Sequence, residues 1–455
     1  MRSIAVTRHI QAPIEEVYEH FTSPSEDKRL DLHSDHVRQY RELDRGPDHL
    51  EYEFVFQAFG MRFFGVGRED FVHPESSILK VSRGVIKGTQ IELRFEPEDG
   101  GTRVTQTTQI PPKVLGLVQH LFGRLVDARI RGITAVHLDE HKRDLEGNDL
   151  GTDNTSGHAR RMGLGDALAL TRPVSLPLVL LPLLAGALVA PGAVGTLALV
   201  LTLVGGGAAL LAGNLTNDIW DFSDGADHAA DAMPEAVLTG SGALLDGRIT
   251  VSGAWKVVAG LVGSAVLCGA ALTPGHLYVP AFAGAGLLVA LAYQAPGLRA
   301  SYRGWGLGEL CIWAAFGPIP VLGATYVQSG TIDTSAVLLG TTFGLGAALV
   351  LYCHHFLHWQ ADRSAGKRSP VAVLGPKTAS RLGMVFALVY GGATAWVLTT
   401  LGAATGPVVA AALAPLLPIS AMWAFATESG APAWRLLVSA YLSYLVCSGA
   451  TLVVL

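Results

Sequence analysis

Short runs of alternating apolar and polar residues fill the first third of the chain. Such alternation is typical of strands with one buried face, and Gly-rich or acidic breaks such as 99–101 separate the runs. The strands are predicted at residues 4–10, 50–59, 63–72, 78–85, 90–96 and 102–110. An amphipathic helix is predicted after Ala12-Pro13, and a long helix from Val114 to about Leu145. These elements predict an α+β domain in which an antiparallel sheet surrounds a long C-terminal helix.

From Leu168 onward the pattern changes to long uncharged runs of Ala, Leu, Gly and Val. A transmembrane helix needs about 20 mostly apolar residues. The runs predict nine spans, at approximately 170–190, 195–215, 254–272, 277–295, 306–327, 334–357, 379–400, 406–426 and 434–455. The Gly-, Asp- and Ser-rich stretch before them predicts a flexible linker. We therefore expect a domain at 1–147, a linker at 148–164 and an all-α membrane domain of nine helices at 165–455.

The charges between the predicted spans follow the positive-inside rule. The connections near 191–194, 273–276, 328–333 and 401–405 contain no Lys or Arg, whereas the others are basic. Nine spans with a cytoplasmic N-terminus require this alternation. We therefore expect a multi-pass protein of the cell membrane, embedded in the lipid bilayer, whose N-terminal domain and charged loops face the cytoplasm.

Composition supports this division and argues against some functions. Half of the 455 residues are hydrophobic, only 16% are charged, and the mean hydropathy is +0.37. The net charge of -5 gives no case for nucleic-acid binding. The four cysteines lie in apolar stretches without CxxC spacing, so we expect core residues and neither disulfides nor a zinc site. The first twenty residues hold no apolar core, which predicts no signal peptide.

An acidic loop emerges directly from the second predicted span, within the segment Asn214–Asp227. Asp218 and Asp221 are three residues apart and would share a helix face. Carboxylate oxygens suit Mg²⁺, whose coordination is completed by waters and substrate phosphates. A diphosphate leaving group needs such neutralisation when its bond to carbon breaks. The alternative is an ordinary solvated acidic loop, which the position at the end of a membrane span disfavours.

Four motifs in order resemble those of the UbiA superfamily of intramembrane prenyltransferases. The string Asn217-Asp-x-x-Asp221-x-x-x-Gly225-x-Asp227 resembles the first Asp-rich motif, in the form of the MenA-like (1,4-dihydroxy-2-naphthoate polyprenyltransferase) branch. The other matching segments are 239–249, 293–309 with its Tyr-x-x-Pro and Arg-Gly-x-Gly-Glu elements, and 362–375, which resembles the end of the second Asp-rich motif. The resemblance covers about 165–455, and that family also has nine helices.

This resemblance implies Mg²⁺-dependent transfer of a polyprenyl group from a polyprenyl diphosphate to an electron-rich aromatic acceptor. The expected Mg²⁺ ligands are Asp218, Asp221, Asp227 and Asp362, and of these Asp218, Asp221 and Asp362 are also expected to be catalytic. The expected substrate-binding residues are Asn214, Asn217, Tyr293, Arg299, Arg303, His354, His355 and Lys367. For the basic residues the alternative interpretation is topology alone, and for His354 and His355 it is a structural hydrogen bond. Tyr293 is expected to shield a cationic intermediate through its ring face.

Two positions depart from the branch. His358 stands where the second motif normally begins with Asp, so the second metal site is expected to be weaker or His358 to handle a proton as a catalytic group. Gly242 stands where the branch often has Arg. Other acceptors therefore stay open: hydroxybenzoate, homogentisate, chlorophyllide, haem, a carotenoid or a glycerol phosphate. A non-catalytic membrane lipid binder or transporter is the alternative from another class.

The first 147 residues resemble the helix-grip fold of the START-like, polyketide-cyclase superfamily (SRPBCC). The segment Ile10-Gln-Ala-Pro-Ile-Glu-Glu-Val-Tyr-Glu-His-Phe21 carries this weakly specific resemblance. The fold implies a domain that binds a hydrophobic or aromatic ligand and exchanges it at the cytoplasmic face. A regulatory or structural module is the alternative.

Overall fold

The computed structural model describes residues 2–22, 37–58, 61–84, 86–111, 127, 130–135, 137–139, 141–146, 170–223, 243–244, 249–304, 306–364, 366–427 and 433–455. They form two compact units, an N-terminal unit that contains all the described strands and a helical unit from residue 170 onward.

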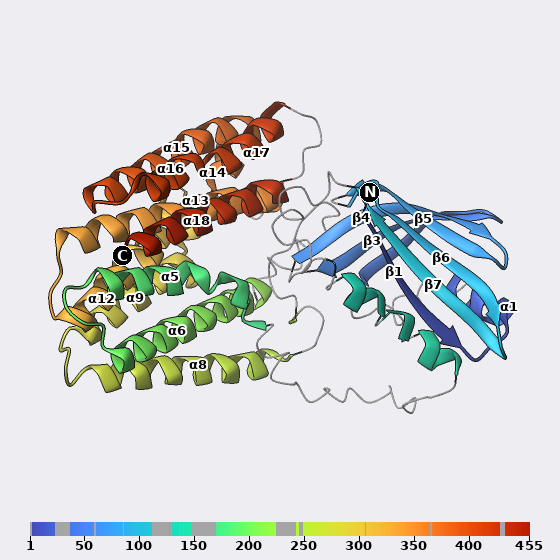
Figure 1. Ribbon diagram of the computed structural model, residues 1–455, viewed down its shortest axis with the longest axis horizontal. Coiled ribbons are helices and arrows are strands. Elements are labelled where there is room, and N and C mark those ends of the chain that lie inside the picture. Colours follow the sequence, from blue (N-terminus) through green and yellow to red (C-terminus); the bar gives the residue numbers. More distant parts are fainter. Residues whose placement is uncertain are drawn as a thin grey trace. The chain divides into compact units, whose positions relative to one another are not determined.

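Seven antiparallel strands form one sheet in the N-terminal unit, in the order β1-β7-β6-β5-β4-β3-β2 (Figure 1). The strands are β1 (Arg2–Ile10), β2 (Val37–Arg45), β3 (His49–Ala58), β4 (Met61–Val72), β5 (Ser76–Gly84), β6 (Gln90–Glu98) and β7 (Gly101–Ile110), and helix α1 (Ile14–Thr22) follows β1. The predicted antiparallel sheet is confirmed. Strand β2 was not predicted, because its sequence VRQYRELDR is too polar to show an apolar alternation.

The inner face of this sheet is packed against helices. Along β7, every second residue from Thr102 to Ile110 is buried. Val17 and Phe21 of α1 pack there with Leu138, which is fully buried. Leu138 belongs to the predicted long helix, of which residues 127, 130–135, 137–139 and 141–145 are described as helical. Residues 112–126 lie outside the described residues, so the start of that helix stays a prediction.

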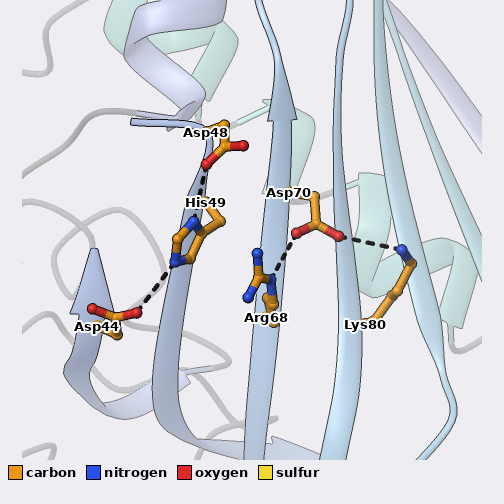
Figure 2. A network of polar contacts seen from close by, with 6 residues as sticks. All are labelled: Asp44, Asp48, His49, Arg68, Asp70 and Lys80. Carbon is orange, nitrogen blue, oxygen red and sulfur yellow. Dashed lines mark hydrogen bonds and ion pairs between the residues drawn. The ribbon is translucent and has the colours of Figure 1, made fainter. Parts of the chain in front are cut away.

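The outer face of the sheet carries the charged network of Asp44, Asp48, His49, Arg68, Asp70 and Lys80 (Figure 2). The His49 ring lies between two carboxylates, with Nδ1 3.0 Å from Asp48 and Nε2 3.2 Å from Asp44. These two contacts raise the pKa of His49 above its ordinary value. Arg68 donates to Asp70 at 2.9 Å. Because the network is exposed, its net contribution to stability is small.

The second unit is all-helical in its described residues. Its helices are η1 (Pro173–Ser175), α5 (Pro177–Val189), α6 (Thr196–Ser223), α8 (Val251–Leu272), α9 (Val279–Gln294), α10 (Ala300–Arg303), α11 (Leu307–Phe316), α12 (Pro318–Ser329), α13 (Thr334–Ser364), α14 (Pro370–Leu374), α15 (Pro376–Thr400), α16 (Thr405–Leu413), α17 (Leu416–Thr427) and α18 (Trp434–Val454).

All nine predicted spans coincide with apolar helical segments, but the number of crossings is not confirmed. Seven segments of the described chain are long and apolar enough to cross a membrane. The segments Pro173–Val189 and Val279–Gln294 are shorter. Prolines account for their limits, since Pro177 begins α5 and Pro296 follows the end of α9.

Helix α13 is the centre of the second unit, and it positions the candidate site. It packs against α5, α11, α12, α14, α15 and α18 (Figure 1). Leu339, Leu349 and Phe356 are almost fully buried along it. At its C-terminal end this apolar helix carries His354, His355, His358 and Asp362. Charged and imidazole groups are costly in such surroundings, which marks this end of the helix for function.

Candidate functional site

The first Asp-rich motif lies at the C-terminal end of α6. Asp218 is only 5% exposed, and its Oδ1 lies 2.9 Å from Nη2 of Arg172. The same Arg172 nitrogen donates to the carbonyl oxygen of Asn214 at 3.1 Å. Arg172 was not among the predicted site residues.

Two asparagines of α6 orient this motif. Asn214 donates through Nδ2 to the carbonyl oxygen of Thr171 at 3.0 Å and to Oγ of Ser175 at 2.8 Å. Asn214 therefore fastens α6 to the start of the first apolar segment. Asn217 donates to Oδ2 of Asp221 at 2.7 Å, which fixes the direction of that carboxylate.

The remaining part of the second Asp-rich motif is a chain of buried charges across three segments. Oδ1 of Asp362 lies 3.4 Å from Nζ of Lys367, and its Oδ2 lies 3.8 Å from Nδ1 of His355. Nε2 of His355 lies 3.2 Å from Oε1 of Glu309 on α11. Asp362 and His355 are 7% and 3% exposed. Glu309 was matched to a motif but given no role, although a carboxylate so close to an apolar helix was itself a signal of function.

Lys367 joins the two motifs electrostatically. Burial opposes its positive charge, but Asp362, Tyr293 and Asp221 together raise the pKa of Lys367 well above its ordinary value. Its Nζ lies 5.5 Å from the ring centre of Tyr302. Carboxylates of both motifs therefore lie within electrostatic range of the Lys367 ammonium group.

The loop between α9 and α11 is held by its own arginine and glycine. Arg303 donates to the carbonyl oxygens of Leu298 at 2.6 Å and Gly297 at 2.9 Å. Gly304 has a φ of 78°, and a Cβ there would lie 3.0 Å from atoms of Arg368. The Arg368 N–H donates to the carbonyl oxygen of Tyr302 at 3.2 Å. This loop is therefore docked onto the segment that carries Lys367.

The three histidines near the end of α13 have different neighbours. His354 and His358 are half-buried, and their ring centres lie 5.1 Å apart. His355 is turned instead toward Glu309 and Asp362. Tyr293 ends α9, where its carbonyl oxygen accepts a hydrogen bond from Ser301 at 2.9 Å.

The two arginines predicted for the site have different surroundings. Arg299 lies against the same aromatic ring as Lys367, with its Cζ 5.1 Å from the centre of Tyr302. Arg303 is exposed and holds backbone carbonyl groups. Asp227 lies outside the described residues, so its predicted role as a metal ligand stays a prediction.

The donor groups of the site are compatible with Mg²⁺. Oδ2 of Asp362 is buried and has no hydrogen-bond partner within the described chain. No group of three His, Cys, Asp or Glu side chains among the described residues is gathered closely enough to hold a metal by itself. Mg²⁺ does not need one, because it binds through one or two carboxylates and completes its shell with waters and substrate phosphates.

Curated relatives match part of the chain. A 2-carboxy-1,4-naphthoquinone phytyltransferase of Synechocystis sp. is 30% identical over 37% of this chain and 52% of its own length. The chain covers 42% of the corresponding chloroplastic enzyme of Arabidopsis thaliana, so it spans about half the length of these two relatives. The 1,4-dihydroxy-2-naphthoate octaprenyltransferase of Escherichia coli is 28% identical over 45% of this chain and 68% of its own length.

Solved structures resemble each unit separately. A UbiA homolog from Archaeoglobus fulgidus bound to GPP and Mg²⁺ covers 63% of this chain and 98% of its own, with 16% identity and a TM-score of 0.45. TTHA0849 from Thermus thermophilus covers 32% of this chain and 99% of its own, with 18% identity and a TM-score of 0.29. Both scores lie below 0.5, so these likenesses add nothing to the assignment.

The family model described as "UbiA prenyltransferase family" matches residues 179–450, more than half of the chain. The UbiA prenyltransferase domain-containing protein 1 of Ailuropoda melanoleuca is 30% identical over 51% of this chain and 68% of its own length. The matched region contains both acidic motifs, with Asp218, Asp221, His355, Asp362 and Lys367. The chain therefore belongs to the UbiA prenyltransferase family.

Proposed function

We propose that the chain transfers a prenyl group from an allylic diphosphate to an electron-rich aromatic acceptor, in a reaction that depends on Mg²⁺. The observation that carries this proposal is the pair of buried acidic motifs, each with a cation in contact: Arg172 lies 2.9 Å from Asp218, and Lys367 lies 3.4 Å from Asp362. The family membership supports the reaction type. The named naphthoquinone and naphthoate transferases support an acceptor of the 1,4-dihydroxy-2-naphthoate type and a role in quinone biosynthesis.

Asp218, Asp221 and Asp362, with Asp227, are the residues that would hold Mg²⁺. When bound, the metal supplies positive charge that neutralises the diphosphate as it leaves. Asn217 keeps one oxygen of Asp221 engaged at 2.7 Å and so presents the carboxylate in one orientation. The positive charge of Arg172 compensates the negative charge of the buried Asp218 carboxylate.

The cations of the site bind the diphosphate oxygens. Lys367 and Arg299 both lie against Tyr302, which keeps their charged ends together. Charge-assisted hydrogen bonds from such groups to phosphate oxygens are about twice as strong as neutral ones. Arg303 serves the same site by holding the loop, through the carbonyl oxygens of Leu298 and Gly297. Tyr293 offers its ring to the allylic cation.

The orientation in the membrane is part of the proposal. The basic connections favour a cytoplasmic position for the N-terminal unit and for both acidic motifs. The prenyl tail would lie along the apolar helices. The N-terminal unit would bind a hydrophobic or aromatic ligand on the same side.

The test uses the purified full chain in lipid nanodiscs, with Mg²⁺, allylic diphosphates of several lengths and a panel of aromatic acceptors. Asp218→Asn and Asp221→Asn should each lower turnover about 10²–10³-fold or more, because a charge that stabilises the leaving group is lost. Asp333→Asn is the matched control, since this carboxylate accepts the N–H of Ala336 at 2.8 Å at the other end of α13.

Near-normal Mg²⁺-dependent turnover in both motif variants would overturn the proposal. If the unaltered chain releases no diphosphate from any allylic substrate, the lipid-binding alternative is favoured. Turnover with another acceptor class would keep the reaction and replace the acceptor.

A further inference from the structure

Three histidines lie within five residues of α13, at the end of an apolar helix. Only one of them is explained by the contacts of the acidic motifs. His355 is 3% exposed and lies between Glu309 and Asp362, at 3.2 and 3.8 Å. It therefore braces α11 against α13 and orients Asp362, and it is not placed to receive an acceptor.

His354 and His358 form a separate imidazole pair. They are four residues apart and so share one face of the helix. Their ring centres lie 5.1 Å apart with planes tilted by 60°, whereas His354 and His355 are 6.5 Å apart. Both side chains are half-buried, and Nδ1 of His358 is itself buried without a hydrogen-bond partner within the described chain.

The imidazole pair lies beside the groups assigned to the diphosphate. His358 is four residues before Asp362 on α13, so the two side chains share one face of that helix, and Asp362 contacts Lys367. A second substrate that contacts these imidazoles would therefore lie next to the diphosphate. Neutral imidazole is a weaker partner for Mg²⁺ than carboxylate is, but its unprotonated ring nitrogen can accept a hydroxyl proton.

We infer that His354 and His358 form the subsite for the hydroxylated aromatic acceptor of the proposed reaction, and that His358 deprotonates the acceptor's hydroxyl group. This inference rests on the proposed prenyl transfer. It excludes acceptors without an O–H group, such as a carotenoid hydrocarbon. His354 orients the ring, and His358 accepts the proton.

The electron balance of this step is simple. The bond between the allylic carbon and oxygen breaks, and both electrons leave with the diphosphate. A π electron pair of the arene forms the new carbon–carbon bond. The hydroxyl proton moves to His358, and the O–H electron pair becomes the C=O bond of a dienone. The dienone returns to the hydroxyarene when the ring proton moves to that oxygen, and His358 passes its proton to water.

The experiment compares His358→Gln, His354→Gln and the control His276→Gln in the full chain. His276 lies in the same unit between α8 and α9, at the end of α9 opposite Tyr293. Each variant is assayed with a hydroxynaphthoate and with its methyl ether, and equilibrium binding of an allylic diphosphate and of the hydroxynaphthoate is measured directly. Thermal unfolding of each variant checks that it folds.

His358→Gln should lower turnover of the hydroxynaphthoate about 10²–10⁴-fold, the usual contribution of a general base. The unaltered chain should discriminate strongly against the methyl ether, and this discrimination should vanish in His358→Gln. Diphosphate binding should change less than about threefold, since the imidazole pair contacts the other substrate. His354→Gln should weaken equilibrium binding of the hydroxynaphthoate, which is measured without turnover. The control His276→Gln should change neither binding nor turnover.

Unchanged turnover in His358→Gln, or equal loss of diphosphate and acceptor binding, would overturn the inference. Loss of activity in Asp218→Asn with normal activity in His358→Gln would refute the subsite alone. If no substrate pair reacts, the proposed transfer fails, while the binding of the hydroxynaphthoate still decides whether the imidazoles form its subsite.

Discussion

The contact between Arg172 and Asp218 permits a quantitative test of the first motif. Replacing Arg172 with Gln removes the cation that lies 2.9 Å from a carboxylate whose side chain is 7% exposed. At an effective dielectric of about 20, this separation corresponds to an attraction of about 5–6 kcal/mol before the desolvation cost is counted. Breaking a buried pair costs about 3–5 kcal/mol. Because the Arg172 side chain is 23% exposed, we expect the lower end, about 3 kcal/mol.

The assay is unfolding of the purified chain in nanodiscs, followed by intrinsic fluorescence with and without Mg²⁺. A loss of this size should lower the midpoint by several degrees. Arg363→Gln is the control, because it makes the same charge change at an exposed position near the end of α13. Added Mg²⁺ should restore part of the stability of Arg172→Gln, since a cation bound at Asp218 replaces the missing charge.

Two results would refute this reasoning. If Arg172→Gln and Arg363→Gln unfold at the same midpoint, the ion pair does not stabilise the fold as the geometry requires. If Mg²⁺ shifts the midpoint of Arg172→Gln no more than that of the unaltered chain, Asp218 is not a metal ligand.

Three further predictions concern the rest of the chain. The raised pKa of His49 means that its stabilising contribution is complete below its ordinary pKa of 6.5 and is lost as pH rises through the raised value. His49→Gln should therefore flatten the pH dependence of thermal unfolding of the N-terminal unit on the alkaline side, and an unchanged profile would contradict this. Gly304→Ala should lower turnover more than Gly297→Ala: both have positive φ, a strain of about 1–2 kcal/mol, but only Gly304 has Arg368 within 3.0 Å of the added methyl group. Equal kinetic effects of the two would argue against loop docking. Leu138→Ala should destabilise the N-terminal unit by about 2–5 kcal/mol in a urea titration, because the side chain is fully buried against α1 and the sheet; a loss below 1 kcal/mol would contradict that packing.

The sequence predicted structure best where apolar residues repeat at a regular spacing. The alternation of β7 identifies its buried face because a strand with one buried face must repeat every two residues. Strand β2 was not predicted because Tyr40 is its only residue described as buried, and one apolar position does not make an alternating pattern. The apolar runs located the nine apolar segments of the membrane unit but not the short helices α10 and α14. Run length alone also did not anticipate where prolines shorten α5 and α9.

The candidate site shows a similar division. Asp218 and Asp221 could be predicted as neighbours because their spacing places them on one helix face. The partnerships of Arg172 with Asp218 and of Glu309 with His355 join segments far apart in the chain, and no local pattern encodes them. His355 is separated from the pair of His354 and His358 by its contact with Glu309 on α11. The position of α11 is known only from the folded structure.

The contact between Lys367 and Asp362 links the binding of metal to the binding of diphosphate. While Asp362 is free of metal, its carboxylate attracts the Lys367 ammonium and competes with any incoming phosphate. A cation that joins Asp362 would weaken that attraction and make the ammonium available to a diphosphate oxygen. Binding of metal and of diphosphate should therefore reinforce each other, and by thermodynamic reciprocity each should tighten the other by the same factor. Because of this lysine, metal alone or diphosphate alone would bind more weakly than either does in the presence of the other.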